Sequence, residues 1–234
     1  MQGKHILACD DLNWHLWRMI ISPGRKFIFV HIPKTGGTSM ALALEDRAHK
    51  DDILIGDTPK AQLRKPRLKK LRPSGRLWKH STLADINGIL SPQAMADMFV
   101  FTLVRNPWDR MVSYYHWLRA QSFNNPAVSV AKTNDFAGFL SDRSTQMSVS
   151  NWPYTNYLTD ATGTERCQLF ARIEALDTDL DPLWSHLGFR LNVPHVNKSY
   201  RPSDYRFVYT EATVDLVARL CATDISRFGY RFDA

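Results

Sequence analysis

Three runs of apolar residues along this chain have the length and composition of buried β-strands. The runs cover residues 26–32, 99–104 and 167–173. A segment with helical spacing follows each run, at residues 38–49, 107–120 and 177–187. Strands that alternate with helices predict a parallel sheet with helices on both faces. The pattern therefore predicts an α/β fold of three layers around a central parallel sheet.

Capping signals predict three further helices. Ser91 is followed by proline, which is the N-cap and N1 pattern of a helix over residues 92–98. Thr210 opens a helix over about 211–227, whose apolar residues are spaced as one buried stripe. Thr82 stands three residues before an aspartate, and this spacing resembles a capping box, so a helix is predicted from about residue 82.

Length and composition predict one domain. The chain has 234 residues, of which 44% are hydrophobic, and we expect a single domain over 1–234 with a basic, irregular insertion at 50–79. Residues 12–21 are apolar but interrupted by polar side chains, and no run approaches the roughly 20 residues of a membrane span. The three cysteines are odd in number and far apart, which argues against a disulfide framework. We expect a cytoplasmic protein without a membrane anchor.

The loop after the first strand carries the most specific chemistry of the chain. Its sequence is Pro33-Lys34-Thr35-Gly36-Gly37-Thr38-Ser39. The two glycines let the backbone approach a ligand closely, and the following helix offers free N–H groups and the positive end of its dipole. Lys34 adds a mobile positive charge. These features predict a site for an anion, expected to be a nucleotide phosphate.

The same loop does not fit the Walker A pattern of P-loop NTPases. That pattern requires lysine directly after its second glycine, whereas Lys34 precedes both glycines here. A kinase or NTPase would also need a metal-binding aspartate, and none is placed as required. A kinase-like or NTPase-like nucleotide-binding protein remains the alternative function. Turnover that survives a chelator would argue against this alternative, because such an enzyme needs a bound metal ion.

A second motif follows the strand at 99–104. It reads Arg105-Asn-Pro-Trp-Asp-Arg-Met-Val-Ser113. Ligands of open α/β sheets collect at the carboxyl ends of the strands, so this loop and the one at 33–39 can face one crevice. The alternative is a purely structural role, with a buried strand and an amphipathic helix whose Arg110 forms a salt bridge. A guanidinium fork, however, suits a terminal phosphate.

Together the two motifs resemble the sulfotransferases that use 3′-phosphoadenosine 5′-phosphosulfate (PAPS). The first is similar to the 5′-phosphosulfate loop, and the second to the 3′-phosphate motif R-x-P-x-x-R-x-x-S. The match is strongest to the carbohydrate O-sulfotransferases, including heparan sulfate 2-O-sulfotransferases, here as a soluble bacterial type. Residues 172–174 resemble the R-x-E step of the family, and the likeness runs from about 26 to 232. It is weakest at 50–78 and 120–150.

The resemblance implies a P-loop-like fold, PAPS as cofactor, adenosine 3′,5′-bisphosphate as product, and no metal. It implies that Lys34 acts on the bridging oxygen and the sulfonate. It also implies a set of cofactor ligands: Thr35, Gly36, Gly37, Thr38 and Ser39 on the 5′ side, with Arg105 and Ser113 on the 3′-phosphate. The implied reaction moves a sulfuryl group to an acceptor hydroxyl, expected on a carbohydrate.

A base must remove the proton of the acceptor hydroxyl, and histidine is suited to this near neutral pH. His80 precedes Ser81 at a junction before the predicted helix, and its place between the two phosphate motifs resembles that of the general base histidine in the 2-O-sulfotransferases. We therefore expect His80 to be the base. A structural hydrogen bond is the alternative role for this residue. His31 is the second candidate base, although packing beside the loop suits it better; His116 and His195 could line the pocket.

The net charge of +7 is concentrated in one segment. Its basic residues are Lys60, Arg64, Lys65, Arg67, Lys69, Lys70, Arg72, Arg76 and Lys79, with no acid from 58 to 84. If His80 is catalytic, these charges would surround the acceptor entrance and favour a polyanionic acceptor such as an anionic glycan. A solvated loop that serves solubility explains them equally well. Nucleic-acid binding is not expected, because aromatics are sparse there and no nucleic-acid-binding signature is present.

Overall fold

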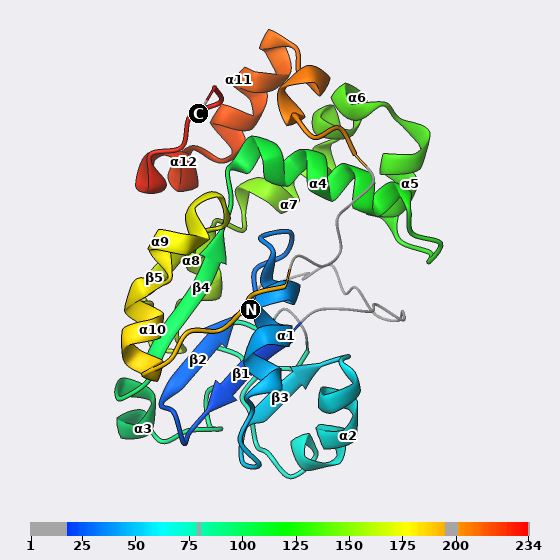
Figure 1. Ribbon diagram of the computed structural model, residues 1–234. Helices are drawn as coiled ribbons and strands as arrows, with labels where there is room; N and C mark the ends of the chain where they lie inside the picture. Colours follow the sequence, from blue (N-terminus) through cyan, green and yellow to red (C-terminus); the bar gives the residue numbers. More distant parts are fainter. Residues whose placement is uncertain (1–17, 79–80, 195–200, 234) are drawn as a thin grey trace.

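The computed structural model describes residues 18–78, 81–194 and 201–233. This part of the chain contains a five-stranded sheet in the order β3-β1-β2-β4-β5 (Figure 1). The strands are β1 (Arg18–Ser22), β2 (Phe27–Val30), β3 (Ile53–Gly56), β4 (Phe99–Val104) and β5 (Leu169–Arg172). The α/β class predicted from the hydrophobic pattern is confirmed.

The predicted parallel strands form the centre of the sheet, and the sheet as a whole is mixed. β2, β4 and β5 are parallel neighbours, whereas β1 runs antiparallel to both β2 and β3. The reason is local: a tight turn joins β1 to β2, in which Lys26 N–H donates to the Pro23 carbonyl at 3.3 Å and Lys26 has φ +54°. A short turn can join only antiparallel neighbours. The interrupted apolar run at 12–21 thus ends in a strand.

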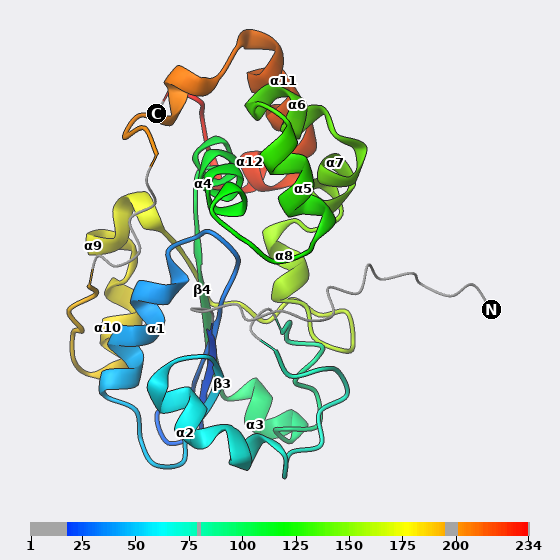
Figure 2. The ribbon, with the colours of Figure 1, turned by 90° about the vertical axis from the view of Figure 1, so that its right-hand side faces the viewer.

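Helices cover both faces of the sheet and gather beyond its carboxyl end (Figure 2). On one face lie α1 (Gly37–Asp46), α9 (Leu176–Asp179) and α10 (Asp181–Leu187). The other face carries α3 (Pro92–Ala96) and α8 (Tyr154–Tyr157), and α2 (Pro59–Leu68) follows the edge strand β3. The group beyond the sheet comprises α4 (Pro107–Arg119), α5 (Pro126–Thr133), α6 (Phe136–Ser141), α7 (Arg143–Ser150), α11 (Glu211–Leu220) and α12 (Ala222–Phe228).

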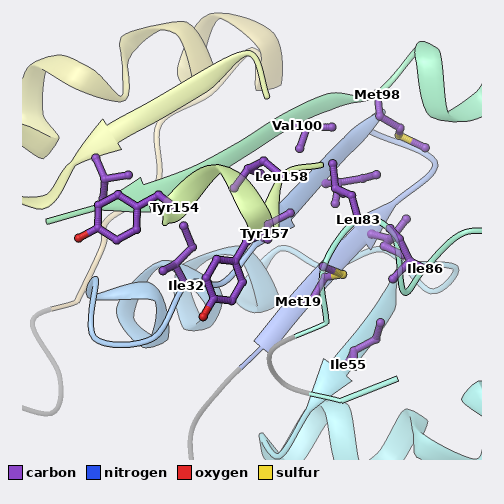
Figure 3. Packing of buried hydrophobic residues seen from close by; sticks show 14 residues of the cluster. Met19, Ile32, Ile55, Leu83, Ile86, Met98, Val100, Tyr154, Tyr157 and Leu158 are labelled. Atoms are coloured by element: carbon purple, nitrogen blue, oxygen red, sulfur yellow. The ribbon is translucent and has the colours of Figure 1, made fainter. Parts of the chain in front are cut away.

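Hydrophobic side chains fill both faces of the sheet. Figure 3 shows the cluster on one face, where Tyr154 and Tyr157 of α8 pack with Leu83 and the strand residues Met19 and Val100. The opposite face packs against α1 and α10, and a third cluster joins α4 to the helices beyond the sheet. The central strands are thereby fixed from both sides, which gives the loops at their carboxyl ends a rigid base.

Three local predictions need correction. The insertion at 50–79 is not irregular throughout, because it contains β3 and α2; Thr58 caps α2 by accepting the N–H of Ala61 at 2.8 Å. No helix begins at Thr82, although the reciprocal bonds between Thr82 and Asp85 do form. They close a turn instead. Two long predicted helices are each divided: the one at 211–227 at Cys221 into α11 and α12, and the one at 177–187 at Leu180 into α9 and α10.

No helix in the described ranges combines the length and the apolar character needed to cross a bilayer.

Candidate functional site

The loop between β2 and α1 has the backbone of an anion site. Lys34 and Gly36 both have left-handed φ angles, +67° and +81°, and α1 begins directly afterwards at Gly37. The Thr35 hydroxyl is buried and donates to the Ile32 carbonyl at 2.9 Å, which closes the loop. The N-terminus of α1, with its N–H groups and the positive end of the helix dipole, therefore lies at this loop, which suits the binding of an anion.

The second glycine of the loop is required by packing. A Cβ at Gly37 would lie 2.0 Å from Cδ2 of His31, whose imidazole is buried beneath the first turn of α1. His31 in turn stacks on Phe29 of β2, with ring centroids 6.3 Å apart. This position agrees with the packing role considered for His31.

The second motif holds the first loop directly. Arg105 follows β4, and its Nη1 donates to the carbonyl of Lys34 at 3.1 Å. Arg110, in the first turn of α4, donates from Nε to the carbonyl of Pro33 at 3.0 Å. These two bonds link segments more than 70 residues apart. The two motifs that sequence analysis singled out therefore form one site, at the carboxyl ends of β2 and β4.

Two arginines share one carboxylate at this site. Asp109 Oδ2 accepts from Arg105 Nε at 2.7 Å and from Nη2 at 2.5 Å, and Asp109 Oδ1 accepts from Arg201 Nη1. All three side chains are largely shielded from solvent. Arg201 and Asp109 were not identified from the sequence. The four-residue spacing of Arg105 and Asp109 could have indicated their ion pair. The contact of Asp109 with Arg201 joins residues 92 positions apart, and no local pattern in the sequence indicates it.

Ser113 lies on α4, about two helical turns after Arg105, and is buried. A hydroxyl in such a place is a donor that a ligand can use. The prediction that Ser113 binds the cofactor is untested, and its position on the same helix as Asp109 is compatible with it.

The ammonium of Lys34 lies in a positive environment. Burial, followed by the nearby charges of Arg105 and Arg201, lowers the pKa of Lys34 from 10.5 to about 7. The Nζ atom lies 5.3 Å from the centre of a Trp117 ring. Sequence analysis also missed Trp117, although it follows Arg110 by seven residues and hence shares its face of α4. A cation cluster of this kind is suited to an anion with several negative charges.

The third sequence motif supports the start of α4. Glu174 accepts the N–H of Asn106 at 2.6 Å, and burial raises the pKa of its carboxyl group. The Tyr154 hydroxyl donates to the carbonyl of Arg105 at 2.7 Å. These bonds hold the junction between β4 and α4, so Glu174 of the R-x-E step acts on the position of Arg105.

The predicted base His80 lies outside the described residues, as does His195. The residues beside His80 are well anchored: the Ser81 hydroxyl donates to the Trp78 carbonyl at 2.7 Å, and Leu83 N–H donates to the Tyr157 carbonyl at 3.0 Å. Tyr157 belongs to α8, next to Tyr154. His116 lies on α4, where burial lowers its pKa, with further contributions from Arg119 and Arg201.

The basic segment is not centred on the site. Its helix α2 lies beside β3, at the end of the sheet away from α4 in both views (Figures 1 and 2). Three of its cations bind carbonyl groups in the last turn of α1 or in the segment that follows it. Lys60 binds that of Glu45, Arg67 that of Lys50, and Arg64 those of two further residues. These bonds stabilise the carboxyl end of α1. The expectation that the basic residues surround the acceptor entrance does not hold for α2.

Comparison with known proteins identifies the family of this chain. A model of the Sulfotransferase family matches residues 17–231. No curated protein matches the chain. Among solved structures, mouse sulfotransferase SULT7A1 complexed with PAP is similar at 19% sequence identity, with a TM-score of 0.40, over 88% of this chain and 67% of the mouse chain. With nearly its whole length matched, this chain belongs to the sulfotransferase family and is an enzyme of sulfuryl transfer.

Proposed function

We propose that this enzyme transfers the sulfuryl group of PAPS to an acceptor hydroxyl. One observation carries the proposal: Arg105 donates to the carbonyl of Lys34, so the phosphosulfate-like loop and the 3′-phosphate-like motif form a single site. A donor with phosphate groups at both ends of a ribose requires such a pair of anion sites. A nucleotide with only a 5′-phosphate would leave the arginine side unused.

In this proposal the loop from Thr35 to Ser39 binds the 5′-phosphosulfate through the N–H groups at the start of α1. The 3′-phosphate lies against Arg105 and Ser113. Arg201 is added to this group because it is tied to Arg105 through Asp109. Charged guanidinium groups bind a dianionic phosphate more strongly than a ribose hydroxyl, and this difference would select the cofactor.

The reaction follows from positions and charges. The acceptor oxygen forms a bond to sulfur while the bond from sulfur to the bridging phosphate oxygen breaks. The proton of the acceptor passes to His80, and adenosine 3′,5′-bisphosphate leaves. Negative charge grows on the bridging oxygen during the reaction. The ammonium of Lys34 therefore stabilises the transition state more than the ground state. The partial burial of Lys34 and the burial of Arg105 would strengthen these charge interactions.

The acceptor is proposed to be a carbohydrate hydroxyl. The support is the likeness of the two motifs to carbohydrate O-sulfotransferases. The position of α2 gives no further support to an anionic glycan, since its charges lie away from the site. A single catalytic domain over 1–234 and a cytoplasmic location belong to the same proposal.

The test uses PAPS labelled with ³⁵S and a panel of acceptors: sugars, anionic glycans, phenols, lipids and simple alcohols. We expect label to reach a sugar hydroxyl, with equal rates in the presence of a chelator. Lys34→Ala should abolish most of the transfer, and Lys65→Ala on the exposed face of α2 serves as the matched control. Transfer to none of the acceptor classes, or complete loss with the chelator, would refute the proposal.

A further inference from the structure

Trp117 is in contact with the ammonium of Lys34. The Nζ atom lies 5.3 Å from the centre of the ring, within the roughly 6 Å at which an indole face attracts a cation. Tyr114 stacks on the same indole, with centroids 6.1 Å apart and planes inclined by 13°. A ring held by a second ring has little freedom to turn away, so the contact with Lys34 is part of a built arrangement.

The helix that carries Trp117 also holds the backbone around Lys34. Arg110 donates to the carbonyl of Pro33, and Arg105, just before the helix, donates to that of Lys34. Lys34 has φ +67°, a conformation that costs free energy in a residue with a Cβ and persists only where the surroundings impose it. Arg105 and Arg110 therefore constrain the backbone around Lys34, and Trp117 of α4 constrains its side chain.

We propose that Trp117 is a positioning residue for the reaction: its indole holds the ammonium of Lys34 in place and in the charged form. This inference rests on the proposed function, in which Lys34 stabilises the departing phosphate. It adds a residue that neither of the two family-like motifs contains.

The charges around Lys34 explain why an aromatic ring suits this role. Arg105 and Arg201 disfavour the ammonium, and with burial they lower the pKa of Lys34 to about 7. Asp109 is bonded to both arginines and offsets part of their charge. A further carboxylate beside Lys34 would favour the ammonium but would repel the phosphosulfate. The face of an indole favours the ammonium without adding a net negative charge.

The first test measures the pKa of Lys34 without any cofactor. Competitive acetylation over a pH series, read by mass spectrometry of the peptide that contains Lys34, gives this value in the complete chain. We expect Trp117→Leu to lower the pKa by about 0.4 to 1.5 units, and Trp117→Phe to lower it less. Trp152→Leu is the matched control, because Trp152 is half-exposed and its ring contacts Tyr157. An unchanged pKa in Trp117→Leu would overturn the inference.

The second test compares kcat, its pH profile and ligand binding in the same variants. Trp117→Leu should lower kcat by about 3- to 30-fold, with Trp117→Phe between it and the wild type. Because Lys34 must be protonated, the alkaline limb of the profile should move to lower pH. Affinity for adenosine 3′,5′-bisphosphate, compared at a pH below the Lys34 pKa of every variant, should stay within about threefold, since packing around the 3′ side is untouched. Equal losses of kcat in the Phe and Leu variants would mean that Trp117 only fills space.

The experiments distinguish a failure of this inference from a failure of the proposed function. If the wild-type protein did not bind adenosine 3′,5′-bisphosphate, the proposed cofactor would be wrong. The dependence of the Lys34 pKa on Trp117 could still be measured in that case, and it would decide whether the indole holds the ammonium.

Discussion

Gly37 offers the sharpest test of the loop geometry. In Gly37→Ala the new methyl group would lie 2.0 Å from Cδ2 of His31, whereas carbon atoms in contact are normally about 3.5–4 Å apart. His31 is buried and cannot move without disturbing the strand end. Overpacking of this kind costs about 1–3 kcal/mol and sometimes more. We expect a loss of about 3 kcal/mol in the free energy of unfolding, or roughly 6–12 °C in melting temperature for a chain of this size.

The assay is urea unfolding of a double-mutant cycle with His31→Ala, which opens the space that the methyl group needs. In the His31→Ala background, Gly37→Ala should cost less than about 1 kcal/mol. Gly188→Ala is the control, because Gly188 has a left-handed φ of +77° but nothing within 4 Å of a Cβ, so it should lose only about 1–2 kcal/mol from backbone strain. If Gly37→Ala lost no more than this control, or if His31→Ala gave no relief, the packing described here would be wrong.

Three further predictions concern the reaction. Lys34→Ala should lower kcat by about 10²–10³; an unchanged kcat with a raised KM would restrict Lys34 to binding. Because Lys34 has a pKa of about 7 in the free protein and a bound anion raises it, binding of the bisphosphate should take up a proton. Its affinity, measured by calorimetry, should therefore fall as pH rises above about 7 and should be flat in Lys34→Met; a flat wild-type profile would contradict the assigned charge. His80→Asn should lose about 10²–10⁴ in rate and the acidic limb of the pH profile while still binding the bisphosphate; more than about a tenth of the wild-type kcat would require another base.

The elements that carry the site could be predicted because their signals are local. The strand at 99–104 was predicted with its exact bounds, since an apolar β-prone run ends at Arg105, and Pro107 shortly afterwards suits the first turn of a helix. Gly36 and Gly37 marked the loop and the start of α1. The parts that were missed depend on pairing at a distance. β1 and β3 pair with each other, and the apolar run at 53–55 is only three residues long within a charged stretch, so its own sequence did not single it out as an edge strand.

The site itself was predicted in its two motifs but not in the contacts that join them. Lys34 and Arg105 were expected to face one crevice, and the bond from Arg105 to the Lys34 carbonyl agrees with this. The sequence could not show that Asp109 connects Arg105 to Arg201, because that contact depends on how the C-terminal segment folds back over α4. Trp117 was hidden for a different reason: an aromatic residue at helical spacing is usually part of the core.

Calorimetric titration with adenosine 3′,5′-bisphosphate and with AMP tests the central claim most directly, because the two ligands differ only in the 3′-phosphate. Charge-assisted hydrogen bonds to that phosphate predict a preference of about 10- to 150-fold for the bisphosphate. Arg105→Ala should reduce this preference to near unity. Equal affinities for the two ligands in the wild-type protein would contradict the account, because the second motif would then bind no phosphate.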